Sequence, residues 1–185
     1  MISHRHHWAL LALTGLVMAA SLISLGRNLI CQCGYVKLWH GEVISSENSQ
    51  HLLDWYSPSH VLHGLVFYMV LHFLLPRLNT GWRLVLAGVI EAAWEIVENT
   101  SWIIDKYRED TIALDYYGDS VLNSLSDMSM MVIGFIIASR APVWVSVCLF
   151  IAAELIVGLF IRDGLLLNVI MLLYPLDWIR QWQAG

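Results

Sequence analysis

Residues Val143–Ile161 read VWVSVCLFIAAELIVGLFI, and Glu154 is the single charged side chain in this stretch. An apolar stretch of this length matches the roughly 20 residues that a helix needs to cross the hydrocarbon core of a bilayer. The whole chain of 185 residues follows the same trend, with 58% hydrophobic and 14% charged residues, whereas soluble domains carry about 25% charged residues. We therefore predict an integral membrane protein, which disfavours a cytosolic enzyme and a disordered protein.

Similar apolar runs recur on both sides of this stretch, and in lipid such runs form helices because every backbone polar group must be satisfied internally. We predict an all-α membrane helix bundle that makes the chain 1–185 a single transmembrane domain. Its six expected spans are about 8–25, 58–75, 82–98, 120–138, 143–161 and 165–182, with longer outer loops at about 26–57 and 99–119. Because Pro175 interrupts the last span, five spans plus a partial or re-entrant sixth is the alternative.

The distribution of charged residues predicts the orientation of the chain in the membrane and the classes of partner that it can bind. The short connections carry Arg77, Arg83 and Arg140, and short cytoplasmic loops are enriched in such residues. We therefore expect both termini to be cytoplasmic in a bacterial inner (plasma) membrane, with the long loops outside. The net charge of −5 and the lack of a basic cluster exclude nucleic acid as a partner. Membrane lipid is the expected partner, and a protein partner and the oligomeric state stay open.

The polar side chains of the expected spans all fall in one half of the membrane. Successive spans alternate in direction, so the end of one span and the start of the next lie on the same side. With the orientation above, this is the outer half, beneath the long loops. The set consists of Arg27, Cys31, His60, His63, Glu91, Glu95, Glu98, Asp119, Asn123, Asp127, Glu154, Arg162, Asp163 and Asn168.

Glu91, Glu95 and Glu98 line one helix face, because they are spaced by four and three residues. An ionised acid in the middle of a membrane costs at least about 2.5 kcal/mol, so these carboxylates need partners, protons, a metal or a wet cavity. Two interpretations stay open: a stripe of metal ligands or proton relays, and a buried network that pairs with arginine or histidine.

A second polar stripe consists of Asp119, Asn123 and Asp127, each four residues from the next. Asp119 has an ordinary interpretation as a helix cap. Asp127 lies about 12 Å further along the helix, where capping cannot explain it. We therefore favour Asp127 as the functional member.

His60 and His63 are spaced to point together from the first turns of their span. Two histidines at a membrane interface often only bond headgroups or loop carbonyls, but together with the carboxylates they form a nitrogen and oxygen ligand set that suits zinc, manganese or iron. The predicted ligands are His60, His63, Glu98 and Asp127, and the predicted catalytic residues are Glu95 and Asp127.

Two smaller motifs have structural interpretations. Cys31 and Cys33 are spaced too closely for an easy unstrained disulfide, and they could bind a soft metal such as copper or be structural. Gly88 with Ala92, and Gly134 with Ala138, provide faces of small residues for close helix packing within one chain or in a dimer.

Four stretches carry a resemblance to a known family. They are Leu38–Gly41 (LWHG), Ser45–His51 (SSENSQH), Asp54–His60 (DWYSPSH) and Asp115–Ser120 (DYYGDS). With them, nearly the whole chain resembles a family of bacterial multi-pass inner-membrane proteins of unknown function, which implies a location and no particular chemistry. A weaker likeness, through Gly118, Asp119 and the segment 123–127, is to VanZ-like membrane proteins, and it brings no catalytic assignment.

Three functions fit these patterns. The first is a metal-dependent hydrolase or transferase that acts on a lipid or lipid-linked envelope substrate at the outer leaflet. The second is a proton- or ion-coupled carrier whose carboxylates form a relay, although the opposite half of the membrane offers little matching polar path beyond His72. The third is a non-catalytic assembly or interaction protein whose polar network fixes the bundle.

Overall fold

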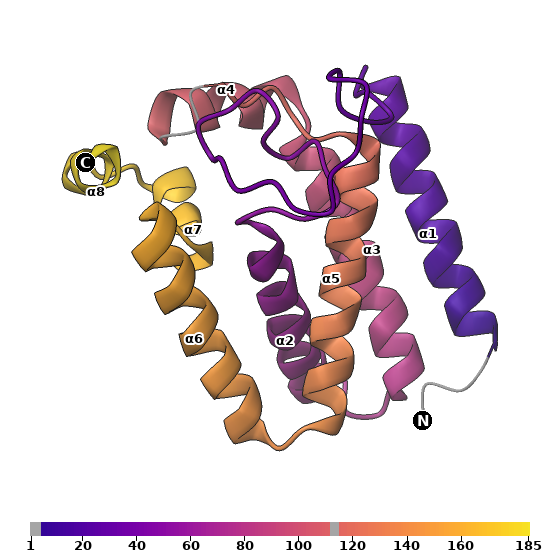
Figure 1. Ribbon diagram of the computed structural model, residues 1–185. Helices are drawn as coiled ribbons and strands as arrows, with labels where there is room; N and C mark the ends of the chain where they lie inside the picture. Colours follow the sequence, from indigo (N-terminus) through magenta and orange to yellow (C-terminus); the bar gives the residue numbers. More distant parts are fainter. Residues whose placement is uncertain (1–4, 112–114) are drawn as a thin grey trace.

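A computed structural model describes residues 5–111 and 115–185. Over these residues the fold is all-helical and contains no named strand (Figure 1). The eight helices of the described residues are α1 (Arg5–Ser24), α2 (Ser57–Leu74), α3 (Thr80–Glu98), α4 (Ser101–Asp110), α5 (Val121–Arg140), α6 (Val143–Ile161), α7 (Leu165–Leu173) and α8 (Asp177–Ala184).

The five long helices α1, α2, α3, α5 and α6 coincide closely with the first five predicted spans. Local signals explain two of their starts: the Asn79 side chain accepts a hydrogen bond from the Trp82 amide at 3.0 Å, and the Ser120 side chain accepts one from the Asn123 amide at 3.1 Å. Such side-chain acceptors satisfy the amides that a helix start leaves unpaired.

Among the described residues, three helices are long and apolar enough to cross a membrane: α1, α5 and α6. The membrane prediction is supported to this extent, and six spans are not confirmed. Helix α3 has the length of a span but also carries Arg83 and the carboxylates of the polar stripe, which lower its apolar character.

The predicted sixth span, 165–182, is not one continuous helix and is not confirmed as a crossing. The segment breaks at Tyr174–Leu176 into α7, with nine residues, and α8, with eight residues. At 1.5 Å per residue α7 is about 14 Å long, which is half of the hydrocarbon thickness. The alternative of a partial sixth helix fits better, since Pro175 cannot continue a helix.

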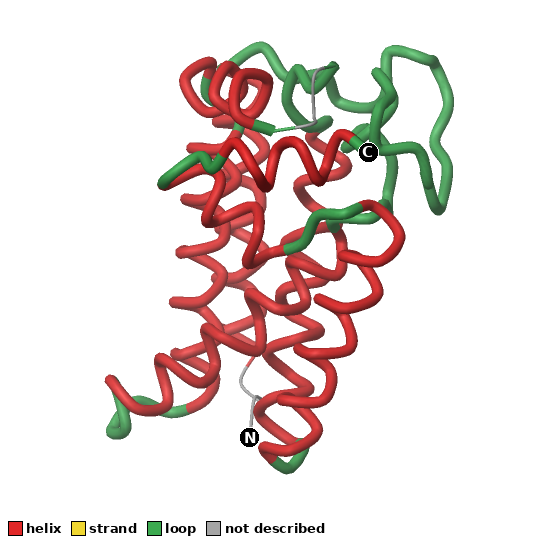
Figure 2. The backbone as a smooth tube through the Cα atoms, turned by 90° about the vertical axis from the view of Figure 1, so that its left-hand side faces the viewer, coloured by secondary structure: helices red, strands yellow, loops and turns green. Residues whose placement is uncertain are grey.

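The two ends of the described chain lie at opposite ends of the bundle. Helix α1 starts at the lower end of Figure 1, whereas α8 lies at the upper end with α4 and the long loop. Figure 2 shows the same arrangement from the side, with most of the loop backbone gathered at the upper end. The cytoplasmic side expected for both termini stays a prediction.

The second predicted loop, 99–119, contains the helix α4, which the sequence patterns did not predict. Helix α4 is mostly polar and short, so it lacks the apolar run that marks the spans. It lies across the upper end of the bundle (Figure 1), and its apolar side chains Ile103, Ile104 and Tyr107 are buried.

Helices α2 and α5 pack against each other at two glycines. A Cβ atom on Gly64 would lie 2.0 Å from the carbonyl oxygen of Met131, and one on Gly134 would lie 2.0 Å from the carbonyl oxygen of Val61. The predicted small face at Gly134 is therefore used within the chain. The close approach brings His60 of α2 next to Asp127 of α5.

The long loop between α1 and α2 is bonded to the start of α5. The amide of Val121 donates to the carbonyl of Asn28 at 2.8 Å, and the amide of Ser120 donates to the carbonyl of Ser49 at 3.0 Å. The side chain of Asn123 donates to the carbonyl of His51 at 2.9 Å. The loop therefore covers the end of the bundle where the polar side chains gather.

Candidate metal centre

Glu91 of α3 binds both histidines of α2. Its carboxylate lies 2.7 Å from Nδ1 of His60 and 3.0 Å from Nδ1 of His63, and its side chain is completely buried. A carboxylate that holds one ring nitrogen of a histidine fixes the orientation of the ring and leaves the other nitrogen for a ligand. Glu91 therefore orients the two imidazoles.

The second ring nitrogen of His60 faces α5. Its Nε2 lies 3.8 Å from Oδ2 of Asp127, and its Nδ1 lies 3.6 Å from Oε1 of Glu95. One ligand atom from each of His60, Glu95 and Asp127 falls within 4.8 Å of the others. Three buried groups from three different helices thus meet at one point, as a metal site requires.

Glu95 is the least satisfied group of the cluster. The residue is 0% exposed, and neither carboxylate oxygen has a hydrogen-bond partner among the residues that the structure describes. Leaving a buried polar group without a partner costs about 1–3 kcal/mol, and more when it is charged. The chemistry of these donors therefore fits a cation, which would supply the missing partner.

Asp119 is fixed next to this group by the end of α3. Asn99 donates a hydrogen bond through Nδ2 to Oδ2 of Asp119 at 2.7 Å, and its Oδ1 accepts one from the Asp119 amide at 2.7 Å. The Tyr116 hydroxyl donates to Oδ1 of Asp119 at 3.0 Å. Gly118, with φ at 99°, permits this approach, because a Cβ there would lie 2.9 Å from Oδ1 of Asn99. Burial raises the pKa of Asp119 to about 6.

Glu98 completes a second carboxylate group. Its Oε1 accepts a hydrogen bond of 2.8 Å from the Tyr107 hydroxyl of α4. One oxygen from each of Glu95, Glu98 and Asp119 lies within 4.8 Å of the others. The cluster therefore contains two adjacent ligand groups that share Glu95.

The two groups border a cavity of about 340 Å³, a volume typical of a small-molecule site. Its polar part is lined by His60, Glu98, Asp119 and Asp127, and its apolar part includes Phe67, Ile90, Trp94 and Val169. The cavity thus joins a set of metal-ligand side chains to an apolar wall.

The predicted metal ligands do not all meet at one point. His60 and Asp127 share one group, Glu98 belongs to the second, and His63 lies with His60 and Glu91 in a third group. Sequence spacing identified every carboxylate and histidine of these groups. It did not identify Tyr107, Tyr116 and Asn99, because hydroxyl and amide side chains in a predicted loop give no signal until the loop is folded over the helix ends.

Other residues of the predicted polar set have structural roles. Glu154 accepts the Leu165 amide at 2.9 Å and so caps the start of α7. Arg27 donates to the carbonyl oxygen of Tyr117, Arg162 donates to that of Trp182 at 3.1 Å, and Asn123 bonds the long loop as described above. These contacts tie loops and short helices to the bundle.

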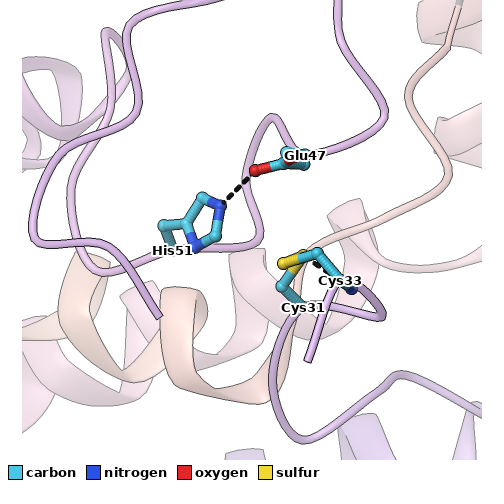
Figure 3. Close-up of side chains that lie close together, drawn as sticks. All are labelled: Cys31, Cys33, Glu47 and His51. Carbon is cyan, nitrogen blue, oxygen red and sulfur yellow. Dashed lines mark hydrogen bonds and ion pairs between the residues drawn. A yellow bond between two sulfur atoms is a disulfide. The ribbon is translucent and has the colours of Figure 1, made fainter. Parts of the chain in front are cut away.

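A further polar group lies in the long loop (Figure 3). Cys31 and Cys33 form a disulfide, although their close spacing does not favour an easy unstrained bridge. His51 lies 2.9 Å from Oε2 of Glu47, and Lys37 approaches the same oxygen at 2.6 Å. The hydrogen bond from Lys37, with those from His51 and Tyr35, lowers the pKa of Glu47 to about 2. The disulfide leaves no thiolate here for the soft metal that the sequence allowed.

Comparison with known proteins agrees with the resemblance found in the sequence. Residues 22–185 match the family model described as "Protein of unknown function (DUF2585)". The chain belongs to this family. A UPF0314 protein of Paracoccus denitrificans is 60% identical over 171 residues, which cover 92% of this chain and 89% of that protein.

Two further relatives extend this agreement. A UPF0314 protein of Rhizobium meliloti is 53% identical over 95% of this chain and 90% of its own length. One of Sphingopyxis alaskensis is 50% identical over 98% of this chain and 96% of its own length. No solved structure matches the chain. The names of these relatives state no activity, so a function has to rest on the site itself.

Proposed function

We propose that this chain is a metal-dependent hydrolase or transferase that acts on a lipid or lipid-linked envelope substrate at the outer face of a bacterial inner membrane. The observation that carries the proposal is the meeting of His60, Glu95 and Asp127 beside a cavity, with Glu95 buried and without a hydrogen-bond partner among the described residues. The proposed ligand set therefore takes Glu95 in place of Glu98 and His63 of the set predicted from the sequence.

The side chains divide into holding and positioning roles. His60, Glu95 and Asp127 would hold the cation, and Glu91 would orient His60 through its Nδ1 atom, which lies 2.7 Å away. A divalent cation in such a site lowers the pKa of bound water and polarises a substrate oxygen. Glu98 lines the cavity next to these ligands.

The apolar wall supports an amphiphilic substrate. Ile90 is 43% exposed and Val169 is 44% exposed, and both line the cavity together with Phe67. Exposed apolar side chains at this level of a membrane helix contact lipid tails. An acyl or prenyl chain could therefore lie along this wall while its polar headgroup reaches the carboxylates.

The arginines of the short connections support the proposed side of the membrane. Arg77 lies in the connection between α2 and α3, and Arg140 is the last residue of α5. Both positions are at the end of the bundle where α1 starts, and positive charge favours the cytoplasm. The covered polar end, including α8, then faces outward. This revises the predicted position of the C-terminus.

The interior below the site favours an enzyme over a carrier. A carrier needs a polar path through the other half of the bundle. In that half, the described helices bury Leu84, Met131 and Phe135 completely, and these side chains belong to one apolar core. The cavity is therefore suited to binding from one side.

The test is a turnover assay with the full-length protein in detergent and a total lipid extract of a bacterial envelope. Released headgroups are measured by mass spectrometry with Mn²⁺ or Zn²⁺ and with a chelator. Turnover should require the metal, and His60→Ala and Glu95→Gln should each lower it more than about 100-fold. Asp105→Asn, which removes an exposed carboxylate of α4, should retain full turnover.

Two results would overturn the proposal. One is turnover that persists with the chelator and in His60→Ala. The other is a folded wild-type protein that takes up no divalent metal after reconstitution.

A further inference from the structure

The two ligand groups of the cluster share one residue. His60, Glu95 and Asp127 form the first group, and Glu95, Glu98 and Asp119 form the second. Within each group the ligand atoms lie within 4.8 Å of one another. Pairs of metal ions in hydrolytic sites lie about 3.5–4 Å apart, close enough for one carboxylate to contact both.

The carboxylate oxygens of Glu95 have the unoccupied acceptor positions that a shared ligand needs. Both of its oxygens lack a hydrogen-bond partner among the described residues, and its side chain is 1% exposed. A carboxylate has two oxygens with about four acceptor positions. By contrast, Glu91 is already occupied by His60 and His63, so it is suited to orienting ligands rather than binding a cation.

The negative charge of the clustered carboxylates, when they are ionised, also exceeds the charge of one divalent cation. Five carboxylates gather here: Glu91, Glu95, Glu98, Asp119 and Asp127. Within residues 5–111 and 115–185, the basic side chains in ion-pair contact with them are His60 and His63. Unpaired buried charge is costly, and a second cation would balance the Glu98 and Asp119 side of the cluster.

We propose that the site holds two divalent cations, with Glu95 bridging them. The inference rests on the proposed function and deepens it. The first position has one imidazole and two carboxylates and takes Zn²⁺, Mn²⁺ or Fe²⁺, whereas the second has oxygen ligands alone and takes a hard cation such as Mn²⁺ or Mg²⁺.

The surroundings of the second position hold its ligands in place. Asp119 receives hydrogen bonds from Tyr116 and Asn99, and Glu98 receives one from Tyr107. Hydrogen bonds of this kind orient carboxylate ligands toward a metal. Each of these carboxylates keeps acceptor positions for a cation, because each oxygen has two lone pairs.

The test counts Mn²⁺ in the full-length protein, since Mn²⁺ suits both positions. The protein is stripped with a chelator, reloaded with Mn²⁺, freed of excess metal and analysed by mass spectrometry and electron paramagnetic resonance. Wild type should hold two ions per chain with the spectrum of a magnetically coupled pair. Asp119→Asn and Glu98→Gln should each drop to one ion with the six-line spectrum of isolated Mn²⁺.

The controls separate this inference from the proposed function. Asp105→Asn should keep two ions, and Glu98→Gln supplies the result if Asp119→Asn does not fold. A single ion with the isolated spectrum in wild type would refute the second position and leave the one-metal function intact. No ion in folded wild type would overturn both.

Discussion

Glu91 contacts Nδ1 of both imidazoles of α2. We expect Glu91→Gln to weaken metal binding by about 10–100-fold, because the amide no longer fixes the ring orientation. The number of ions bound at saturation should not change. Calorimetric titration of the stripped protein with Mn²⁺ measures both quantities. The exposed Glu109 of α4 supplies the control, Glu109→Gln, and an equal affinity in the two variants would contradict the orienting role.

Asp163 gives a pH dependence that is independent of the metal. Burial raises its pKa from 3.8 to about 6, so between these values the folded state binds more protons than the unfolded state. Stability therefore falls as the pH rises through this window, and about two pKa units correspond to roughly 3 kcal/mol.

Asp163→Asn removes this ionisation and should flatten the profile. The difference in unfolding temperature between Asp163→Asn and wild type, measured in detergent, should shift in favour of the variant from pH 4 to 6 and then level off. Asp105→Asn should give a constant difference, since Asp105 is exposed. A constant difference for Asp163→Asn would show that its carboxyl does not titrate differently on folding.

The spacing of residues along the sequence was enough to predict that the carboxylates and histidines of the site lie in one region. The intervals of the carboxylates on α3, and the alternation of helix direction, place Glu91, Glu95 and Asp127 in one region from the order of the residues alone. Their separate roles depend on which side chains meet across helices. Glu91 and Glu95 have different roles because the two imidazoles bond to Glu91 and not to Glu95. No sequence pattern predicts this difference.

At the scale of the helices, Gly64 and Gly134 determine how closely α2 and α5 approach. A Cβ at Gly134 would lie 2.0 Å from a backbone oxygen of Val61, and the backbone cannot move aside without separating the helices. We expect Gly134→Ala to destabilise the protein by about 1–3 kcal/mol and to weaken metal binding, because His60 and Asp127 sit on these two helices.

Gly158→Ala is the matched control for this prediction. Its nearest contact would be an ordinary 3.8 Å to the Asp163 carbonyl oxygen, and alanine favours a helix over glycine. Thermal unfolding in detergent should show a loss for Gly134→Ala and little change or a gain for Gly158→Ala. Equal stabilities of the two variants would mean that the helices do not pack through this contact.

The long helices were predictable and the short ones were not. Helices α1, α5 and α6 are long and predominantly apolar, so the sequence defines them without help from the rest of the fold. Helix α4 is held by burial of Ile103 and Tyr107 against other segments, which is a tertiary effect. The segment 165–182 has enough apolar residues for a span, but Pro175 and the capping of α7 by Glu154 turn it into two short pieces.

At the scale of the whole molecule, the bundle presents its polar end beneath the long loop, and the proposed function places this end outside the cytoplasmic membrane. Ser46 of the loop and Arg77 of the α2–α3 connection are both exposed. In a Cys148→Ser background, we expect Ser46→Cys to react with a membrane-impermeant maleimide applied to intact spheroplasts. Arg77→Cys should react only after the membrane is opened. The reverse pattern would place the site on the cytoplasmic side.

The central claim is that buried imidazole and carboxylate groups form a metal centre, and X-ray absorption of the zinc-loaded full-length protein tests it most directly. We predict nitrogen and oxygen ligands at about 2.0–2.2 Å, with an imidazole scattering contribution that decreases in His60→Ala. A sulfur shell at about 2.3 Å would place the metal on a cysteine thiolate, such as that of the free Cys148, and would contradict the account.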